Sequence, residues 1–248
     1  IGSSVQSNIV ALAVENSMGI KTWITGIVIT IFSALVILGG IKSIAKAASF
    51  IVPLMAIGYV LGGLAIIFSN MDLLVPALKL IFTDAFTGEA VAGGAIGAVI
   101  RYGVARGVFS NEAGMGSAPI AAAAAKTDHP VRQGLVSMTG TFIDTIIVCS
   151  ITGIVLVMGY LVAGNTFGAE TGAVLTTHIF DRLLPGVGGW VVTFGIIFFA
   201  YSTILGWCYY GEKCATYLFG EKFVLIYRLL YIATVFIGTV ATLDLVWL

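Results

Sequence analysis

Long apolar segments alternate with short polar stretches along almost the whole chain. Each apolar segment is long enough to cross about 30 Å of hydrocarbon as a helix. The segments lie near residues 22–40, 50–69, 91–125, 134–160, 188–211 and 223–241. Residues 5–16 are typical of the last turns of a helix, and residues 243–248 of the start of another. The pattern predicts an all-α, polytopic membrane protein, with residues 1–248 in a single transmembrane domain.

Composition supports a membrane protein and excludes several other classes. Hydrophobic residues make up 59% of the chain, charged residues make up 10%, and the mean hydropathy is +1.07. Soluble domains, in contrast, are about 25% charged. Twelve basic and twelve acidic residues cancel, so no net positive field predicts nucleic-acid binding. Three cysteines without paired spacing indicate neither a disulfide framework nor a zinc site.

The basic residues predict which loops face the cytoplasm, because lysine and arginine are enriched in short cytoplasmic loops. They gather after every second predicted span, at Lys42, Lys46, Lys126, Arg132, Lys213 and Lys222. We therefore expect the loops at 41–49, 116–133 and 211–222 to be cytoplasmic in a plasma-membrane protein. The intervening, mostly acidic loops are expected to face outward.

The third apolar segment contains a polar interruption, "GVFSNEAGMGSAP" at residues 107–119. Its glycines loosen the backbone, Ser110 and Asn111 are favourable helix N-caps, and Pro119 suits the first turn of a new half-helix. The alanines at 121–125 are expected to continue that half-helix. We therefore predict a broken transmembrane helix.

A break within a membrane needs a polar partner, because an unpaired backbone group in hydrocarbon costs several kcal/mol. Freed carbonyls and the ends of half-helices suit a cation, while the N-terminus of a half-helix attracts the carboxylate of a ligand. The alternative is that the glycines only permit close helix packing.

A second group of oxygens lies in "FAYSTILGW", residues 199–207. Ser202 and Thr203 carry adjacent hydroxyls, and the carbonyl of Phe199 projects nearby on the same helix face. Such uncharged oxygens suit a hard monovalent cation. The alternative is that both hydroxyls simply bond back to the preceding turn.

Several stretches together resemble the alanine or glycine:cation symporter family. They are "VQSN", "LVILGGIKSIAKAASFIVPLMAIGY", "RGVFSNEAGMGSAP", "HPVRQGLVSMTGTFIDTIIVCSITG" and "FAYSTILGWCYYGE". The resemblance implies a leucine-transporter-type bundle with two inverted repeats of five helices. The family's glycine-threonine-glycine-asparagine signature of the first core helix is missing. The chain also opens without methionine and stops in an apolar run. We therefore expect a fragment that runs from the end of the third core helix to the start of the tenth and is inactive alone.

The resemblance also implies a substrate site and a sodium site. One wall of the substrate site would be formed by Phe109, Ser110, Asn111, Ala113 and Gly114. Gln6, Thr203 and Trp207 would complete it on other helices, while Phe199, Ser202 and Thr203 would bind sodium. Gln6 has an alternative role in helix association, and Trp207 has one as an interfacial anchor.

Charged residues within predicted spans are functional candidates by default. We expect Arg106, Glu112 and Asp144 to act as gating or structural residues. Asp144 is expected to hydrogen-bond the unwound backbone of its neighbour.

The predicted function is sodium-coupled symport of a small neutral amino acid, alanine or glycine or both, by alternating access. Its partners are the amino acid, the sodium ion and the lipid bilayer, and no organic cofactor is expected. The alternative is a proton-coupled transporter of the same fold, in which Glu112 or Asp144 would titrate. The sequence contains no ring of repeated charges of the kind that lines a channel pore, so it does not indicate a channel. The sequence has no nucleophile motif and no histidine within a predicted span, so it does not indicate an enzyme.

Overall fold

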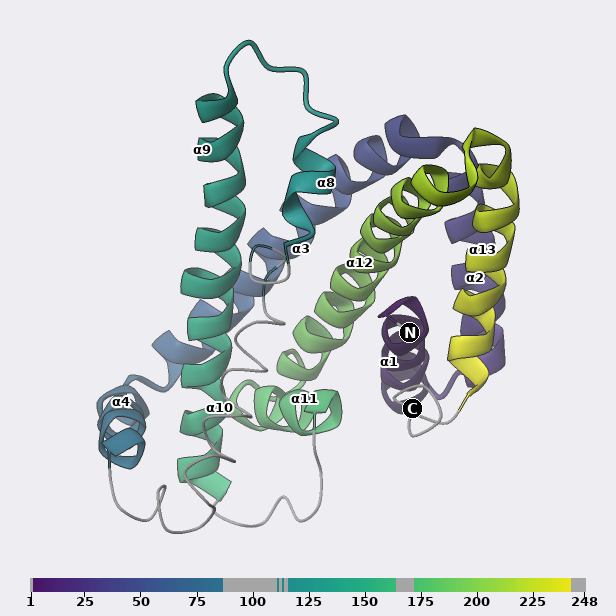
Figure 1. Cartoon of the computed structure of the whole chain (residues 1–248). Coiled ribbons are helices and arrows are strands. Elements are labelled where there is room, and N and C mark those ends of the chain that lie inside the picture. The colour runs from purple at the N-terminus through teal and green to yellow at the C-terminus, as the bar shows by residue number, and fades with distance from the viewer. Residues whose placement is uncertain (1, 87–110, 112, 114–115, 164–171, 242–248) are drawn as a thin grey trace. The chain divides into compact units, whose positions relative to one another are not determined.

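The computed structural model describes residues 2–86, 111, 113, 116–163 and 172–241, and within these ranges it is helical without any strand (Figure 1). Four stretches of the described residues are long and apolar enough to cross a membrane: Gly40–Ser69, Pro130–Ala163, Gly188–Phe219 and Glu221–Val240. Thr22–Leu38 is a shorter apolar helix. The prediction of an all-helical, polytopic membrane protein is thus confirmed.

The helices group into two compact units, and unit 1 comprises residues 1–59, 170–181 and 185–248. It contains α1 (Gly2–Met18), α2 (Thr22–Leu38), the first part of α3 (Gly40–Ser69), most of α11 (Gly172–Leu183), α12 (Gly188–Phe219), η3 (Glu221–Phe223) and α13 (Val224–Val240). α1, α2, α12 and α13 pack side by side (Figure 1). Their shared core consists of Val10, Val14, Ile29, Ala200, Ile204 and Val235.

Glycines let α1, α2 and α13 approach one another closely. Gly26 of α2 lies against the side chain of Thr239, and Gly238 of α13 lies against the backbone of Ser4 in α1. Small residues at helix contacts are typical of membrane proteins, because helix association in lipid depends on close packing.

Unit 2 comprises residues 60–169 and 182–184. It contains the rest of α3, then α4 (Met71–Phe86), α8 (Ala118–Ala122), α9 (Pro130–Thr141), the π-helix η1 (Phe142–Cys149) and α10 (Ser150–Ala163). α9, η1 and α10 follow one another without interruption, from Pro130 to Ala163. The side chain of His129 begins this long helix by accepting a hydrogen bond from the amide of Val131, at 3.2 Å.

Two of the three segments that we predicted to be cytoplasmic loops are largely helical, so the prediction of loops there is wrong. Residues 41–49 lie inside α3, which begins at Gly40, and residues 211–219 lie inside α12, which ends before Gly220 with its φ of +79°. In the third region, 116–133, the non-helical residues are 116–117 and 123–129. The physical reason is that lysine, alanine and glutamate are good helix formers, so a helix continues where the sequence turns polar.

Two further expectations need correction. The segments between predicted spans contain the helices α4 and α11, where we expected loops. Pro119 does lie in the first turn of a helix, but that helix, α8, ends at Ala122 instead of continuing through the alanines to 125.

Candidate substrate and cation site

The α12 oxygens predicted to bind a cation lie together in unit 1. The hydroxyls of Ser202 and Thr203 both donate to the carbonyl of Phe199, at 2.8 and 2.9 Å. The alternative geometry, in which both hydroxyls bond back to the preceding turn, is therefore the one observed. A hydroxyl that donates its proton keeps two lone pairs, so both oxygens remain able to accept a cation.

Trp207 follows Thr203 by one helical turn and is half-buried. Its ring meets that of Tyr210 edge to face, with centroids 6.0 Å apart and an interplanar angle of 74°. The role of Trp207 beside the substrate stays a prediction.

Three consecutive polar residues, Gln6, Ser7 and Asn8, lie on α1. Asn8 donates its two amide hydrogens to the carbonyls of Gly238 and Ala241, at 3.0 and 2.8 Å, and Ser7 donates to the carbonyl of Ser4 at 3.1 Å. Asn8 therefore joins α1 to the end of α13, which is the helix-association role. Gln6 is half-buried on the same helix, and its role as a substrate ligand remains a prediction.

In unit 2, Asn111 is held from both sides. Its side-chain oxygen accepts from the amide of Ala113 at 2.9 Å and from the hydroxyl of Thr141 at 3.3 Å. The first of these bonds has the pattern of a capping bond, but the half-helix that contains Pro119, α8, has Ser117 as its N-cap and not Ser110 or Asn111. Its amide nitrogen lies 3.5 Å from a carboxylate oxygen of Asp144, which is a long hydrogen bond.

Asp144 lies in the π-helix η1. The hydrogen bond from Asn111 reaches its carboxylate from a side chain. The expected bond between Asp144 and the unwound backbone concerns residues that lie mostly outside the described part of the chain, so it stays a prediction. Single π-helical turns frequently mark functional sites, because they shift side chains out of the regular helical register. The structure thus brings Asn111, Thr141 and Asp144 together, and Thr141 carried no signal in the sequence that distinguished it.

The remaining predicted site residues lie outside the described part of the chain. They are Phe109, Ser110, Glu112 and Gly114 of the broken segment, together with Arg106. Their roles stay predictions.

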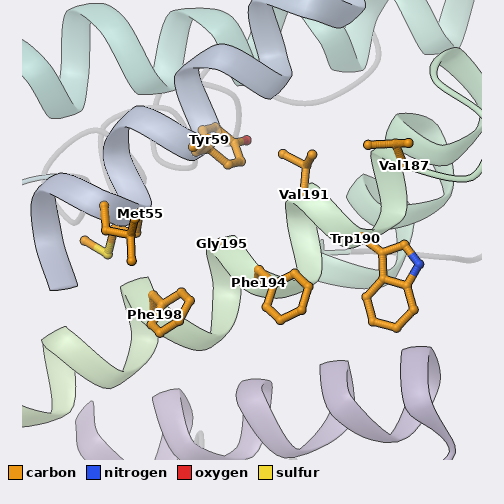
Figure 2. Close-up of a pocket in the computed structure, with 10 residues that line it drawn as sticks. Met55, Tyr59, Val187, Trp190, Val191, Phe194, Gly195 and Phe198 are labelled. Carbon is orange, nitrogen blue, oxygen red and sulfur yellow. The ribbon is translucent and has the colours of Figure 1, made fainter.

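An apolar groove of about 320 Å³ lies between the first part of α3 and α12 in unit 1 (Figure 2). It is lined by Leu54, Met55, Gly58, Tyr59, Val187, Trp190, Val191, Phe194, Gly195 and Phe198. The ring of Tyr59 also meets Phe199 edge-on, at 5.8 Å between centroids. A groove with so few polar groups does not suit the ammonium and carboxylate of an amino acid, so we do not assign the substrate to it.

Sequence reasoning missed an ion pair between α12 and α13. Arg228 donates two hydrogen bonds to the carboxylate of Glu212, at 2.7 and 3.0 Å. A third bond runs from Arg228 to the carbonyl of Leu38 at the end of α2, at 3.2 Å. The signal was one acidic residue in α12, Glu212, and one basic residue in α13, Arg228, but nothing in the sequence shows that these two residues meet.

Comparison with known proteins identifies the family. The pattern of the "Sodium:alanine symporter family" matches residues 1–248. The chain belongs to this family. Its members, including the relatives below, are transporters and not enzymes.

Three curated relatives illustrate the range of the family. The chain is 57% identical over 247 residues to "Sodium/alanine symporter AgcS" of Methanococcus maripaludis, covering 100% of this chain and 54% of the relative. It is 39% identical to "Putative sodium/proton-dependent alanine carrier protein YrbD" of Bacillus subtilis, covering 98% and 53%. It is also 40% identical to "Probable sodium/glutamine symporter GlnT" of Bacillus subtilis, covering 99% and 51%. The chain thus spans about half the length of these relatives.

Proposed function

We propose that the chain belongs to a sodium-coupled symporter for a small neutral amino acid, alanine or glycine or both, in the plasma membrane. The observation that carries this proposal is the family match across residues 1–248. The similarity to a sodium/alanine symporter at 57% identity supports the choice of ion and substrate. The three oxygens on α12 supply uncharged ligands of the kind that sodium prefers.

The proposed architecture is a leucine-transporter-type bundle in which the two inverted repeats alternate access to a site at mid-membrane. Residues 1–248 would form one transporter domain, from the end of the third core helix to the start of the tenth. The substrate-binding residues would include Asn111 and Ala113 of the broken helix, and Gln6, Thr203 and Trp207. The segments rich in lysine and arginine would face the cytoplasm.

The direct test is uptake of labelled alanine by the full-length gene product in proteoliposomes. We expect accumulation with an inward sodium gradient and none with an inward proton gradient or with no gradient. Competition by unlabelled glycine, D-alanine and glutamine then ranks the substrates. Uptake that is equally fast without sodium would contradict the proposal.

Thr203→Ala provides a test of the ion site within that assay. Loss of one hydroxyl ligand is expected to raise the sodium concentration for half-maximal uptake by roughly tenfold, the scale of one lost interaction with a charged group. Thr216→Ala is the matched control, because the Thr216 hydroxyl also bonds back by one turn of α12, to the carbonyl of Glu212 at 2.7 Å. Equal sodium dependence in both variants would remove Thr203 from the ion site.

Proton coupling is the second candidate function, because one relative bears the name of a sodium/proton-dependent carrier and Asp144 is a carboxylate within a span. Asp144→Asn keeps the shape of the side chain but cannot carry a charge or exchange a proton. With sodium coupling, we expect sodium-driven uptake to persist in this variant with the wild-type pH profile. Loss of a proton-driven component present in the wild type would instead favour proton coupling.

A further inference from the structure

Tyr231 of α13 contacts α12 beside the candidate cation ligands. Its hydroxyl donates to the main-chain carbonyl of Ile204, at 2.7 Å. Ile204 directly follows Thr203 in the chain. The carbonyl of Ile204 thus receives a bond from a neighbouring helix, in addition to the bond within α12 that a helical carbonyl normally accepts.

The packing around this hydrogen bond holds α12 in one position against α13. The side chains of Ala200 and Ile204 are buried in the core shared with α1, α2 and α13, and Tyr231 packs against that core. Apolar packing resists separation of the helices but has little direction, whereas a hydrogen bond to one carbonyl sets the rotation and height of α12 against α13. The Phe199–Thr203 turn is therefore held at its end by Tyr231.

We propose that Tyr231 is a positioning residue for the sodium ligands, which it serves by fixing the turn of α12 that carries them. This inference rests on the proposed function, because it concerns the same ion site. A cation site requires its oxygens to be held within about 0.5 Å of their working positions. Tyr231 does not bind the ion, and no group of it needs to approach the substrate.

The test compares Tyr231→Phe with Tyr227→Phe in the full-length gene product. Tyr227 is the matched control, because it lies one turn earlier on α13, its ring packs 5.9 Å from that of Tyr231, and its hydroxyl lies near Gly211, beyond the ligand turn. Each change removes one phenolic oxygen and leaves the ring in place. The measurements are the sodium concentration for half-maximal alanine uptake, the KM for alanine at saturating sodium, and the sodium-induced rise in melting temperature in detergent.

We expect Tyr231→Phe to raise the half-maximal sodium concentration about three- to tenfold, the scale of one net hydrogen bond, and to reduce the sodium-induced rise in melting temperature. The KM for alanine at saturating sodium should change less than the half-maximal sodium concentration, because Thr203 alone among the sodium ligands is also assigned to the substrate. Tyr227→Phe should leave all three quantities near their wild-type values.

Three outcomes would overturn the inference. The first is an unchanged sodium dependence of Tyr231→Phe, and the second is an equal shift in both tyrosine variants. The third is failure of Tyr231→Phe, but not of Tyr227→Phe, to accumulate as folded protein, because the hydroxyl would then serve the fold. If wild-type uptake itself ignores sodium, the proposed function fails, and that result is distinct because it does not involve the variants.

Discussion

Replacing Arg228 with alanine is expected to lower the free energy of unfolding by about 3–5 kcal/mol, because it leaves the carboxylate of Glu212 buried without its partner. The pair is well shielded, with 17% of the Arg228 side chain and 9% of the Glu212 side chain exposed. The same change also removes the bond to the carbonyl of Leu38, so α2, α12 and α13 all lose a common contact. The measurement is thermal or denaturant unfolding in detergent.

The chain supplies a matched control for this prediction. Arg132 and Asp128 form an ion pair at 2.9 Å with 73% and 69% of their side chains exposed. Exposed pairs contribute about 0–1 kcal/mol, so Arg132→Ala should change stability little. A double replacement, Glu212→Leu with Arg228→Met, should recover much of the loss, because no charge then remains buried. Similar melting temperatures for Arg228→Ala and Arg132→Ala would contradict the prediction.

Replacing Gly238 with alanine is the second large effect we expect, a destabilisation of about 1–3 kcal/mol from overpacking. A Cβ atom at this position would lie 2.6 Å from both the Cα and the carbonyl oxygen of Ser4. These are backbone atoms of α1, so they cannot move aside as the end of a side chain can. Relief of the clash would separate α1 from α13 and weaken the bonds from Asn8 to the carbonyls of Gly238 and Ala241.

Gly206→Ala is the control for this change, because a Cβ there meets no described atom within 4 Å. Alanine is favoured over glycine in a helix by about 1 kcal/mol, so Gly206→Ala is expected to be neutral or stabilising. Gly238→Ala should therefore lower the melting temperature, whereas Gly206→Ala should leave it unchanged or raise it. A Gly238→Ala protein as stable as the wild type would show that α1 and α13 do not pack as closely as the structure has them.

The sequence predicted the apolar helices and some of their ends. The hydropathy pattern placed the end of α3 at residue 69 and the start of α12 at residue 188, as observed. It failed at 41–49 and 211–219, where α3 and α12 extend through polar residues. Hydropathy reports which solvent surrounds a segment, whereas the backbone follows helix propensity and hydrogen bonding, which continue past the apolar limit.

The site was predictable where its residues are close in sequence. Phe199, Ser202 and Thr203 occupy one turn of α12, so helical periodicity alone placed their oxygens together. Whether they bind sodium stays a prediction. In contrast, Thr141 bonds Asn111 thirty residues earlier, and Tyr231 bonds Ile204 from another helix. No local spacing relates such residues, because their contact depends on how the helices pack.

The sequence by itself determined the class of protein and the family, because apolar segments of membrane length and specific local motifs are properties of contiguous residues. Only the tertiary structure decided which polar groups are paired across helices: Glu212 with Arg228, Asn8 with the end of α13, and Tyr231 with the carbonyl of Ile204. The physical reason is that a hydrogen bond depends on distance and direction within a few tenths of an ångström. The one-dimensional pattern sets which face of a helix is apolar. The height and rotation of one helix against another arise only when the helices pack, and residues without a side chain, such as Gly26 and Gly238, allow that close packing.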